Sequence, residues 1–371
     1  MTSKTRRPSP TLALGAGLGT AIGLLAVTAP GAMATGSSAY RQVNLVSDVP
    51  GRARATDPHL VNPWGASYLG TSPLWVSDNG PGVATLYSGG VRGSQQTVLP
   101  LVVSIPGGAP TGQVSNPTTS FVIREKGAAA AARFLFVGET GHLSGWAPTV
   151  GGSAMSPSTH AVDAVVTRGA VEKGLAMGTT SHGPRLYVAN FSAARVDVYD
   201  RAFHRVHTSG GFRDTRLPRD FAPFNVMVAG TKVYVSYAQQ DRQRTDEVAG
   251  PGRGRVDAFS LDGKLLRRLQ AHRVLNAPWG MTVAPSGFGR FSGDLLVGNF
   301  GDGRINAFDP SSLAFRGSLR ASGGKALAID GLWALLPGNG TEGSTHDVLF
   351  TAGPQDETHG LVGLLEAAHR R

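Results

Sequence analysis

Cysteine is absent from the sequence, which excludes disulfides, thiol nucleophiles and thiolate metal sites. Charged residues are scarce, at 16%, whereas hydrophobic residues reach 41%, and this balance argues against a disordered chain. After residue 34 no uncharged apolar run approaches the roughly 18 residues of a membrane span. The stability of the fold therefore has to come from side-chain burial alone.

Glycine and proline are plentiful, with 51 and 23 copies among 371 residues. This surplus is typical of a chain with many tight turns, and it favours short strands over long helices. A chain of this length holds either two average domains or one large closed β architecture.

The formal net charge of +10 arises almost entirely from scattered arginines. The longest basic runs are doublets such as Arg267-Arg268. A nucleic-acid-binding protein concentrates its basic residues in a stripe that neutralises phosphates, so we expect no nucleic-acid partner. Weak attraction of the basic protein to acidic polymers of the cell envelope is an alternative that the charge leaves open.

The amino terminus has the pattern of an export signal. Basic residues in positions 1–10 precede an uncharged, mostly apolar stretch, and Ala32-Met33-Ala34 supplies a small-x-small cleavage site. We predict a signal peptide over residues 1–34, a short leader over 35–41, and a secreted protein without membrane association after cleavage. An uncleaved anchor is the alternative, and Arg6-Arg7 leaves the general and twin-arginine routes open.

A unit of about 50 residues recurs six times along the chain. Each copy has a glycine-marked apolar run, then a buried strand, then a strand that usually ends in an aromatic residue; the clearest copy runs from Asn276 to Asp309. The markers are residues 65, 112, 174, 225, 280 and 331, with Asn225 replacing glycine in the fourth. Their spacing is close to the roughly 40–50 residues of four-stranded propeller blades.

One such sheet cannot bury both faces, whereas six packed radially can. The repeats therefore predict an all-β, six-bladed β-propeller over residues 42–365, followed by a tail over 366–371. The segment Gln42–Val46 alternates like a strand but precedes the first unit. We expect it to close the ring by joining the last blade; a free extended arm is the alternative.

Several segments of the sequence resemble known proteins. The run Pro278–Asp309 resembles an NHL-type propeller repeat. Asn62–Gly65, Gly293–Gly303 and Asp330–Trp333 are similar to an uncharacterised family of secreted bacterial propeller-like proteins, over about residues 40–365. This resemblance implies the propeller fold but no assigned activity, and it implies free secretion because the apolar sorting tail of some relatives is lacking.

Equivalent positions of the six units form rings around the propeller axis. The residue before each marker predicts a first ring at the channel mouth, comprising Trp64, Thr111, Lys173, Phe224, Trp279 and Asp330. Asp330 flanked by Trp64 and Trp279 suits a small polar ligand such as a sugar. The alternative is that both tryptophans plug the channel. Lactonases of the gluconolactonase type hold a metal at this place with several oxygens; only Asp330 qualifies, so no metal is predicted.

A second ring ends the second strand of each unit, with Asp78, Glu139, Asn190, Tyr237 and Asn299, and Ala352 in the sixth. Asp and Asn at such places often bond the following turn, which is a structural duty. Acid–base or metal chemistry by Glu139 with Asp78 is the alternative.

The fourth unit carries an insertion from Gln239 to Gly254. It contains Asp241, Asp246 and Glu247 among three arginines, and we expect a solvated loop held by its own ion pairs.

Together these features predict a secreted, monomeric propeller that binds a small molecule, glycan or protein at the channel mouth or loops. An extracellular hydrolase or lyase with its site at the same mouth is the rival, and a structural matrix protein is a third class. No nucleophile elbow, zinc-binding helix motif, phosphate loop or dinucleotide fingerprint is present, so the sequence identifies neither catalytic residues nor a cofactor.

Overall fold

The structure is a computed structural model and describes residues 39–91, 94–270 and 272–368. The predicted signal peptide lies outside the described residues, as do the first part of the leader and the end of the tail. No helix in the described ranges is long and apolar enough to span a membrane. The helical elements there are two short 3-10 turns, η1 (His272–Val274) and η2 (Gly289–Phe291).

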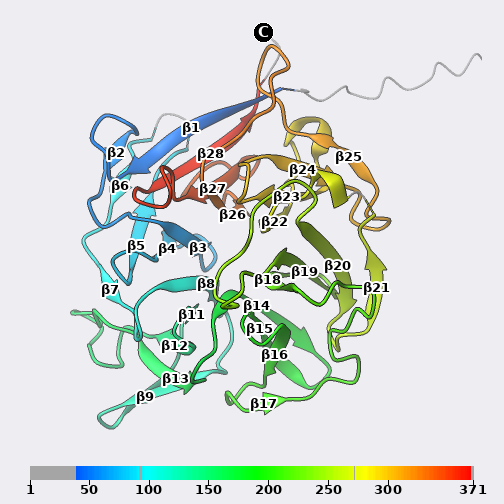
Figure 1. Cartoon of the computed structure of the whole chain (residues 1–371). Coiled ribbons are helices and arrows are strands. Elements are labelled where there is room, and N and C mark those ends of the chain that lie inside the picture. The colour runs from blue at the N-terminus through cyan, green and yellow to red at the C-terminus, as the bar shows by residue number, and fades with distance from the viewer. Residues whose placement is uncertain (1–38, 92–93, 271, 369–371) are drawn as a thin grey trace, which may run out of the picture. The chain divides into compact units, whose positions relative to one another are not determined.

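Six antiparallel sheets surround one axis (Figure 1), as the repeats predict. Each sheet contributes one inner strand, and each inner strand contacts that of the next blade, including the last with the first. The inner strands are β3 (Pro63–Ser67), β8 (Pro110–Ser115), β14 (Glu172–Thr180), β18 (Phe221–Ala229), β22 (Pro278–Val283) and β26 (Leu332–Pro337).

The second strands are buried along most of their length because neighbouring sheets cover both of their faces. They are β4 (Leu74–Asp78), β11 (Phe134–Gly138), β15 (Gly183–Asn190), β19 (Lys232–Gln239), β23 (Leu295–Asn299) and β27 (Val348–Ala352). The third strands are β5 (Val83–Ser88), β12 (His142–Trp146), β16 (Arg195–Tyr199), β20 (Gly254–Ser260), β24 (Ile305–Phe308) and β28 (Leu361–Ala367).

The outermost strands are short. They are β6 (Thr97–Val98) with β7 (Val103–Ser104), β13 (Val162–Val166), β17 (Arg205–Val206), β21 (Leu265–Arg268) and β25 (Phe315–Ser318). A separate hairpin, β9 (Val122–Glu125) with β10 (Ala128–Ala131), is inserted in the second blade.

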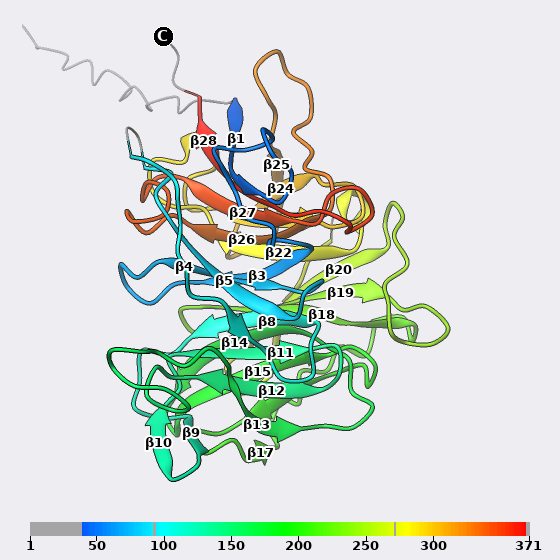
Figure 2. The same ribbon diagram turned by 90° about the vertical axis from the view of Figure 1, so that its left-hand side faces the viewer.

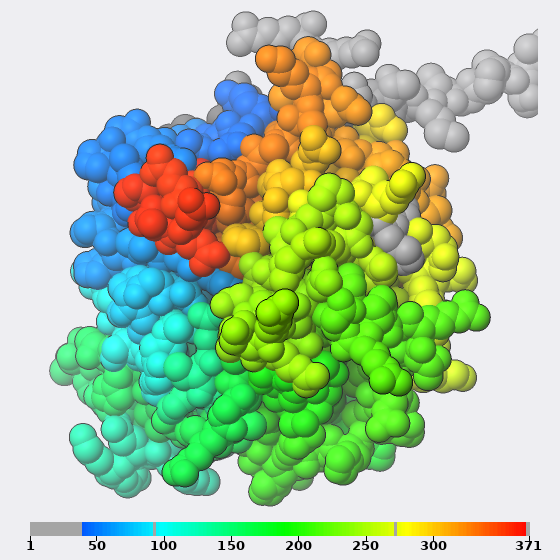
Figure 3. Space-filling model, in the orientation of Figure 1, coloured from blue at the N-terminus to red at the C-terminus, as the bar shows by residue number. Residues whose placement is uncertain are grey.

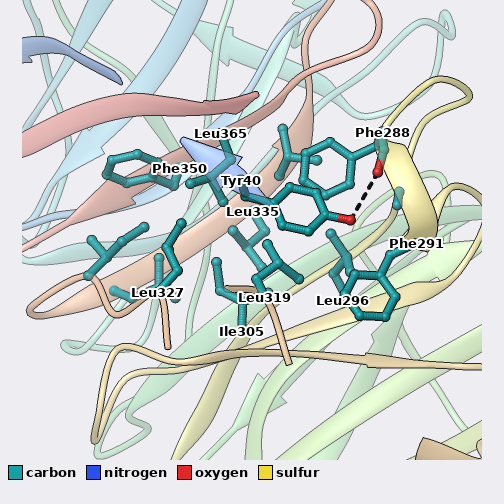
Figure 4. Packing of buried hydrophobic residues seen from close by; sticks show 14 of the residues in the cluster. Tyr40, Phe288, Phe291, Leu296, Ile305, Leu319, Leu327, Leu335, Phe350 and Leu365 are labelled. Carbon is teal, nitrogen blue, oxygen red and sulfur yellow. Dashed lines mark hydrogen bonds between the residues drawn. The ribbon is translucent and has the colours of Figure 1, made fainter. Parts of the chain in front are cut away.

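The ring is closed by the amino-terminal strand, which confirms the predicted closure. Strand β1 (Tyr40–Ser47) pairs antiparallel with β28 of the sixth blade and carries the two-residue β2 (Ala55–Thr56) on its other edge. Figure 2 shows β1 and β28, in blue and red, side by side. The strand begins two residues earlier than predicted, because Tyr40 is part of the core. Its hydroxyl donates to the carbonyl of Phe288 at 3.2 Å among buried side chains (Figure 4).

The marker glycines are required by the close approach of neighbouring inner strands. A Cβ on Gly65 would lie 2.4 Å from the carbonyl oxygen of Thr111, and one on Gly280 would lie 2.4 Å from that of Trp333. In the fourth blade Asn225 uses its side chain instead, donating its amide to the carbonyl of Trp279 at 2.8 Å. The markers therefore set how tightly the blades pack around the axis.

The prediction of Gly331 as the sixth marker is wrong. Pairing of Leu332 with Ala352 makes Leu332 equivalent to Pro63 of the first blade, so Ala334 is the true marker position. Gly331 lies three residues earlier and serves a turn, with a φ of 64° that favours glycine. The sequence around Gly331 resembles the repeat, but it does not lie at the equivalent position of the inner strand.

Candidate functional site

Five of the six predicted first-ring residues lie at equivalent positions of the inner strands, but Asp330 does not. Its place in the ring belongs to Trp333. Asp330 is exposed and accepts the backbone N–H of Gln355 at 2.9 Å, outside the ring. The predicted carboxylate flanked by Trp64 and Trp279 is therefore wrong.

The aromatic members of the ring form an axial plug, which we define as Trp64, Phe224, Trp279, Trp333 and the adjoining Phe300. Trp333 is stacked between Trp64, at a centroid distance of 3.5 Å, and Phe300, at 4.1 Å. Trp279 meets Trp64 edge-on at 6.0 Å. No tryptophan of the plug is more than 3% exposed, so the tryptophans close the channel instead of lining an open pocket.

Thr111, the next ring member, is fully buried and binds two blades together. Its hydroxyl donates to the carbonyl of Glu172 in the third blade at 2.6 Å. That bond gives Thr111 a structural role.

Lys173 is the ring member that carries a charge. Its side chain is 1% exposed, and its ammonium contacts Glu139 at 2.5 Å and Asp246 at 3.2 Å. The same nitrogen lies 4.9 Å from the ring centroid of Trp64, a cation–π contact. Burial acts to lower the pKa of Lys173, but the facing carboxylates outweigh burial and raise the pKa, so the amine is charged.

More acidic groups surround this ammonium than a single ion pair needs. Glu247 follows Asp246 in the insertion of the fourth blade, and Glu357 comes from the loop between β27 and β28. Asn62 donates to Glu357 at 2.6 Å, and Asn79 donates to Glu139 at 3.1 Å. We call this set the axial mouth; it comprises Asn62, Asn79, Glu139, Lys173, Asp246, Glu247 and Glu357.

Two carboxyls of the axial mouth bind protons unusually tightly. Burial raises the pKa of Glu247 to about 7, with Glu357 and Asp246 adding to the rise and Lys173 opposing it. Burial likewise raises the pKa of Glu357, with Glu139 and Asp246 among the groups that add to it. The axial mouth thus carries excess negative charge that these two groups partly neutralise by holding protons.

The predicted second ring splits in two. Asp78 pairs with Pro63, whereas Gly138, not Glu139, pairs with the equivalent Pro110. Glu139 is the first residue of the turn after β11 and reaches Lys173 at the axis, whereas Asp78 is the last residue of β4 and is buried, with Thr85 donating to it at 2.7 Å. The hypothesis of a Glu139–Asp78 acid–base pair is wrong, because the two carboxyls belong to separate networks.

The other members of that ring lie at the equivalent positions. Asn190 accepts the N–H of Ala193 in the next turn at 3.1 Å, which confirms the structural duty predicted for it. Asn299 donates to Asp302 in its own turn at 3.0 Å. Tyr237 is buried, and its hydroxyl has no hydrogen-bond partner among the described residues.

The insertion of the fourth blade does not behave as predicted. Within the described part of the chain, none of its arginines forms an ion pair with its carboxylates, and Asp246 instead pairs with Lys173 on the third blade. Figure 3 shows this insertion, in yellow-green, over the middle of one face. The expectation of a loop held by its own ion pairs is wrong, because the loop is attached to the axis.

A cavity of about 260 Å³ lies along the inner strands beyond the plug. Its walls are mainly apolar and include Met177, Met227 and Met281. The amide of Gln113, one of its few polar groups, is already bonded to Ser67 and to the carbonyl of Trp75. The two ends of the channel therefore differ sharply in polarity.

The described ranges contain no group of three or more His, Asp or Glu side chains placed to hold a metal ion.

Comparison with known proteins gives viral relatives, two of which match over most of the chain. No family model matches the sequence. The uncharacterized protein R648 of Acanthamoeba polyphaga mimivirus is 31% identical over 324 residues, covering 86% of this chain and 78% of that protein. The uncharacterized protein L690 of the same virus is 32% identical over 326 residues, covering 86% and 84%.

Among solved structures, one protein of a nidogen/laminin complex is 13% identical with a TM-score of 0.45, covering 73% of this chain and 82% of that one. Because both sequence relatives are viral, the bacterial origin and secretion implied by the resemblance find no support in them, and the NHL likeness is not confirmed. The chain belongs to the family of these two mimivirus proteins.

Proposed function

We propose that this protein is an extracellular binding propeller whose axial mouth holds a ligand with a positively charged group. The observation that carries the proposal is the convergence of four carboxyls, from three loops of different blades, on the single ammonium of Lys173. Four acids around one base leave a negative site that a cationic ligand neutralises.

Stability alone does not explain this cluster. Burying carboxylates beside other acids opposes folding, and the raised pKa values of Glu247 and Glu357 reflect this, with burial as the main cause and the neighbouring acids as a smaller one. Residues that lower stability in a rigid scaffold are frequently retained for binding or catalysis. The cost of the arrangement therefore supports a functional role.

The exposure of the site also supports ligand entry. The side chains of Asp246 and Glu139 are 67% and 28% exposed, whereas Lys173 beneath them is fixed by the Trp64 ring. A ligand amine or guanidinium therefore meets the carboxylates first, and Lys173 forms the floor that keeps them in place. Such a ligand is a small amine or a basic group of a peptide.

Export of the protein is part of the proposal and rests on the pattern of residues 1–34. The mass of the chain recovered from culture medium checks it, with Thr35 expected as the first residue. Recovery of the whole chain only from inside cells would contradict export and leave the binding proposal to its own test.

Calorimetric titration at low salt and pH 8 tests the binding. Putrescine and agmatine are the cationic ligands, and glucose is the neutral control. We expect both cations to bind, and the substitutions Glu139→Gln and Asp246→Asn each to weaken binding about tenfold through loss of a charge contact. Asp262→Asn is the matched control, since Asp262 is a half-exposed carboxylate paired with Arg185 instead of Lys173.

The proposal also predicts a pH dependence. The pKa of Glu247, about 7, means that this carboxyl ionises between pH 6 and pH 8, so affinity for a cation rises over that interval. In the Glu247→Gln variant the rise becomes smaller. Absence of cation binding at every pH, or an affinity in both the Glu139→Gln and the Asp246→Asn variant that equals that of the parent protein, would refute a cationic ligand at the axial mouth.

A hydrolase or lyase is the second candidate, and one observation favours it. A carboxyl with a pKa of about 7 is matched to proton donation at neutral pH, and Glu247 has that property. Mass spectrometry of envelope glycans incubated with the protein separates the candidates. Product that is lost in Glu247→Gln would favour the enzyme, whereas binding without product would favour the scaffold.

A further inference from the structure

A large polar pocket lies away from the axis, at the third and fourth blades. It measures about 710 Å³ and is bordered by β16, by β17 with the segment that follows it, and by Tyr237 on β19. None of these residues belongs to the axial mouth. We call it the lateral pocket.

The outer wall of the lateral pocket is held in place by the fourth blade. The N–H of Gly210 donates to the carbonyl of Asp262 at 2.8 Å, and the N–H of Phe212 donates to that of Gly263 at 3.1 Å. The ring of Phe212 also packs against Tyr187 and Phe259, at 5.6 and 5.3 Å. The wall is therefore a fixed part of the fold.

One buried carboxylate orients two guanidinium groups at this pocket. Asp197 is 1% exposed, and one of its oxygens lies 2.8 Å from the Nε atoms of both Arg195 and Arg205. Its other oxygen accepts the amide of Asn190 at 2.7 Å. Neither arginine bonds another described residue through its Nη atoms, so two donor-rich ends remain open in exposed side chains.

The remaining charges at the pocket add to the positive balance. Asp214, the second bordering carboxylate, is occupied by Arg268, whose Nη2 lies 2.6 Å from it. Arg213 also borders the pocket and is exposed. The two bordering acids are therefore already paired with arginines, whereas guanidinium donors are left over. Burial, with Asp214 adding to it, raises the pKa of the nearby Asp257 to about 8, so that carboxyl adds little negative charge at neutral pH.

An independent observation comes from Tyr237. The residue borders the pocket and is 2% exposed, and its hydroxyl has no hydrogen-bond partner in the described part of the chain. Buried hydroxyls are nearly always bonded, because an unpaired one opposes folding. A ligand atom in the pocket would supply the missing partner.

We propose that the lateral pocket binds a small polar ligand that carries an oxyanion, a carboxylate or a phosphate. The Nη groups of Arg195 and Arg205 hold the oxyanion, because guanidinium forks match the geometry of both groups. The hydroxyl of Tyr237 bonds a polar atom of the same ligand. This site takes a charge opposite to that of the axial mouth, and it does not depend on the function proposed there.

Calorimetric titration of the whole protein with four compounds tests the proposal: glucuronate, glucose 6-phosphate, inorganic phosphate and glucose. We expect glucuronate or glucose 6-phosphate to bind and glucose not to bind. Arg195→Gln and Arg205→Gln should each weaken binding about tenfold. Arg316→Gln is the matched control, since Arg316 is an exposed arginine paired with Asp309 on the fifth blade.

The substitution Tyr237→Phe separates binding from a structural role. It removes the hydroxyl but keeps the ring, so we expect weaker binding by about fivefold with no fall in Tm. Binding of phosphate alone that is lost in both arginine variants would support the site and assign it to phosphate. Absence of binding by all three anions, or affinity unchanged in the arginine variants, would overturn the proposal.

Discussion

The axial plug and the axial mouth occupy neighbouring levels of one channel, and they are held together by different forces. The plug consists of stacked and edge-on aromatic rings that bury almost all of their surface. Two of its indoles also donate hydrogen bonds, from Trp279 to the carbonyl of Lys173 and from Trp333 to Asn62, both at 3.0 Å. The mouth consists of charges of both signs, with acids in excess.

This difference separates the stabilising plug from the proposed binding site. Aromatic burial stabilises the closed ring, whereas the mouth gathers acids and raises the pKa values of two of them, mainly through burial and secondarily through the neighbouring acids. A change in the plug should therefore lower stability at any pH. A change in the mouth should alter stability by an amount that depends on pH.

The largest effect is expected for Trp333→Ala. Trp333 is fully buried between Trp64 and Phe300, and large-to-small changes of such aromatics cost about 3–5 kcal/mol. Urea denaturation followed by circular dichroism measures the loss. Phe315→Ala, on the exposed outer strand of the fifth blade, is the control and should cost below about 1 kcal/mol. Equal losses in the two variants would mean that the plug does not stabilise the ring.

An intermediate effect is expected for Lys173→Met. Removing one partner of a buried ion pair costs about 3–5 kcal/mol, and the exposure of Asp246 and Glu139 reduces this to about 2–3 kcal/mol at pH 8. Lys173 lowers the pKa values of Glu247 and Glu357, so its removal raises them further. The variant should then lose stability more steeply than the parent as pH rises.

Denaturation midpoints of Lys173→Met at pH 5 and pH 8 check this prediction. Lys264→Met, at an exposed turn, is the control and should change stability by less than about 0.5 kcal/mol at either pH. A loss that is the same at pH 5 and pH 8 would show that Lys173 does not neutralise the acids around it.

The architecture was predictable because it repeats. Buried second strands recur six times and glycine occupies four of the six marker positions, where the next blade approaches closely, as at Gly65 and Gly280. The closing strand was recognisable from its alternation, although its start at Tyr40 was not, since an aromatic residue at a strand end has no periodic signal. Periodic features constrain the whole ring at once.

The axial mouth was less predictable because most of it does not repeat. Glu247 and Glu357 lie in the loops between the second and third strands of the fourth and sixth blades, which are longer than in the other blades, and nothing in the sequence indicates that these longer loops turn toward the axis. Glu139 lies one residue past the equivalent strand position, which belongs to Gly138, and is part of the turn that follows β11. Trp333 was missed because Gly331 imitates a marker three residues too early. Only Lys173 had a repeat position that pointed to the channel.

The smallest effect, and the sharpest test of the comparison, is expected for Glu247→Gln. The folded protein raises the pKa of this carboxyl from 4.5 to about 7, so the folded state binds the proton more tightly than the unfolded state. The stabilising contribution of that proton is complete below pH 4.5 and is lost as pH rises through 7. Glutamine undergoes no such loss. We therefore expect the variant to match the parent at pH 4 and to exceed it by about 1–2 kcal/mol at pH 8, a value reduced for partial exposure. Urea titrations at the two pH values measure this difference in stability. A gain in stability that coincides with weaker binding of putrescine would show that the axial mouth gives up stability for binding. A difference in stability that does not vary with pH would contradict a buried, protonated Glu247.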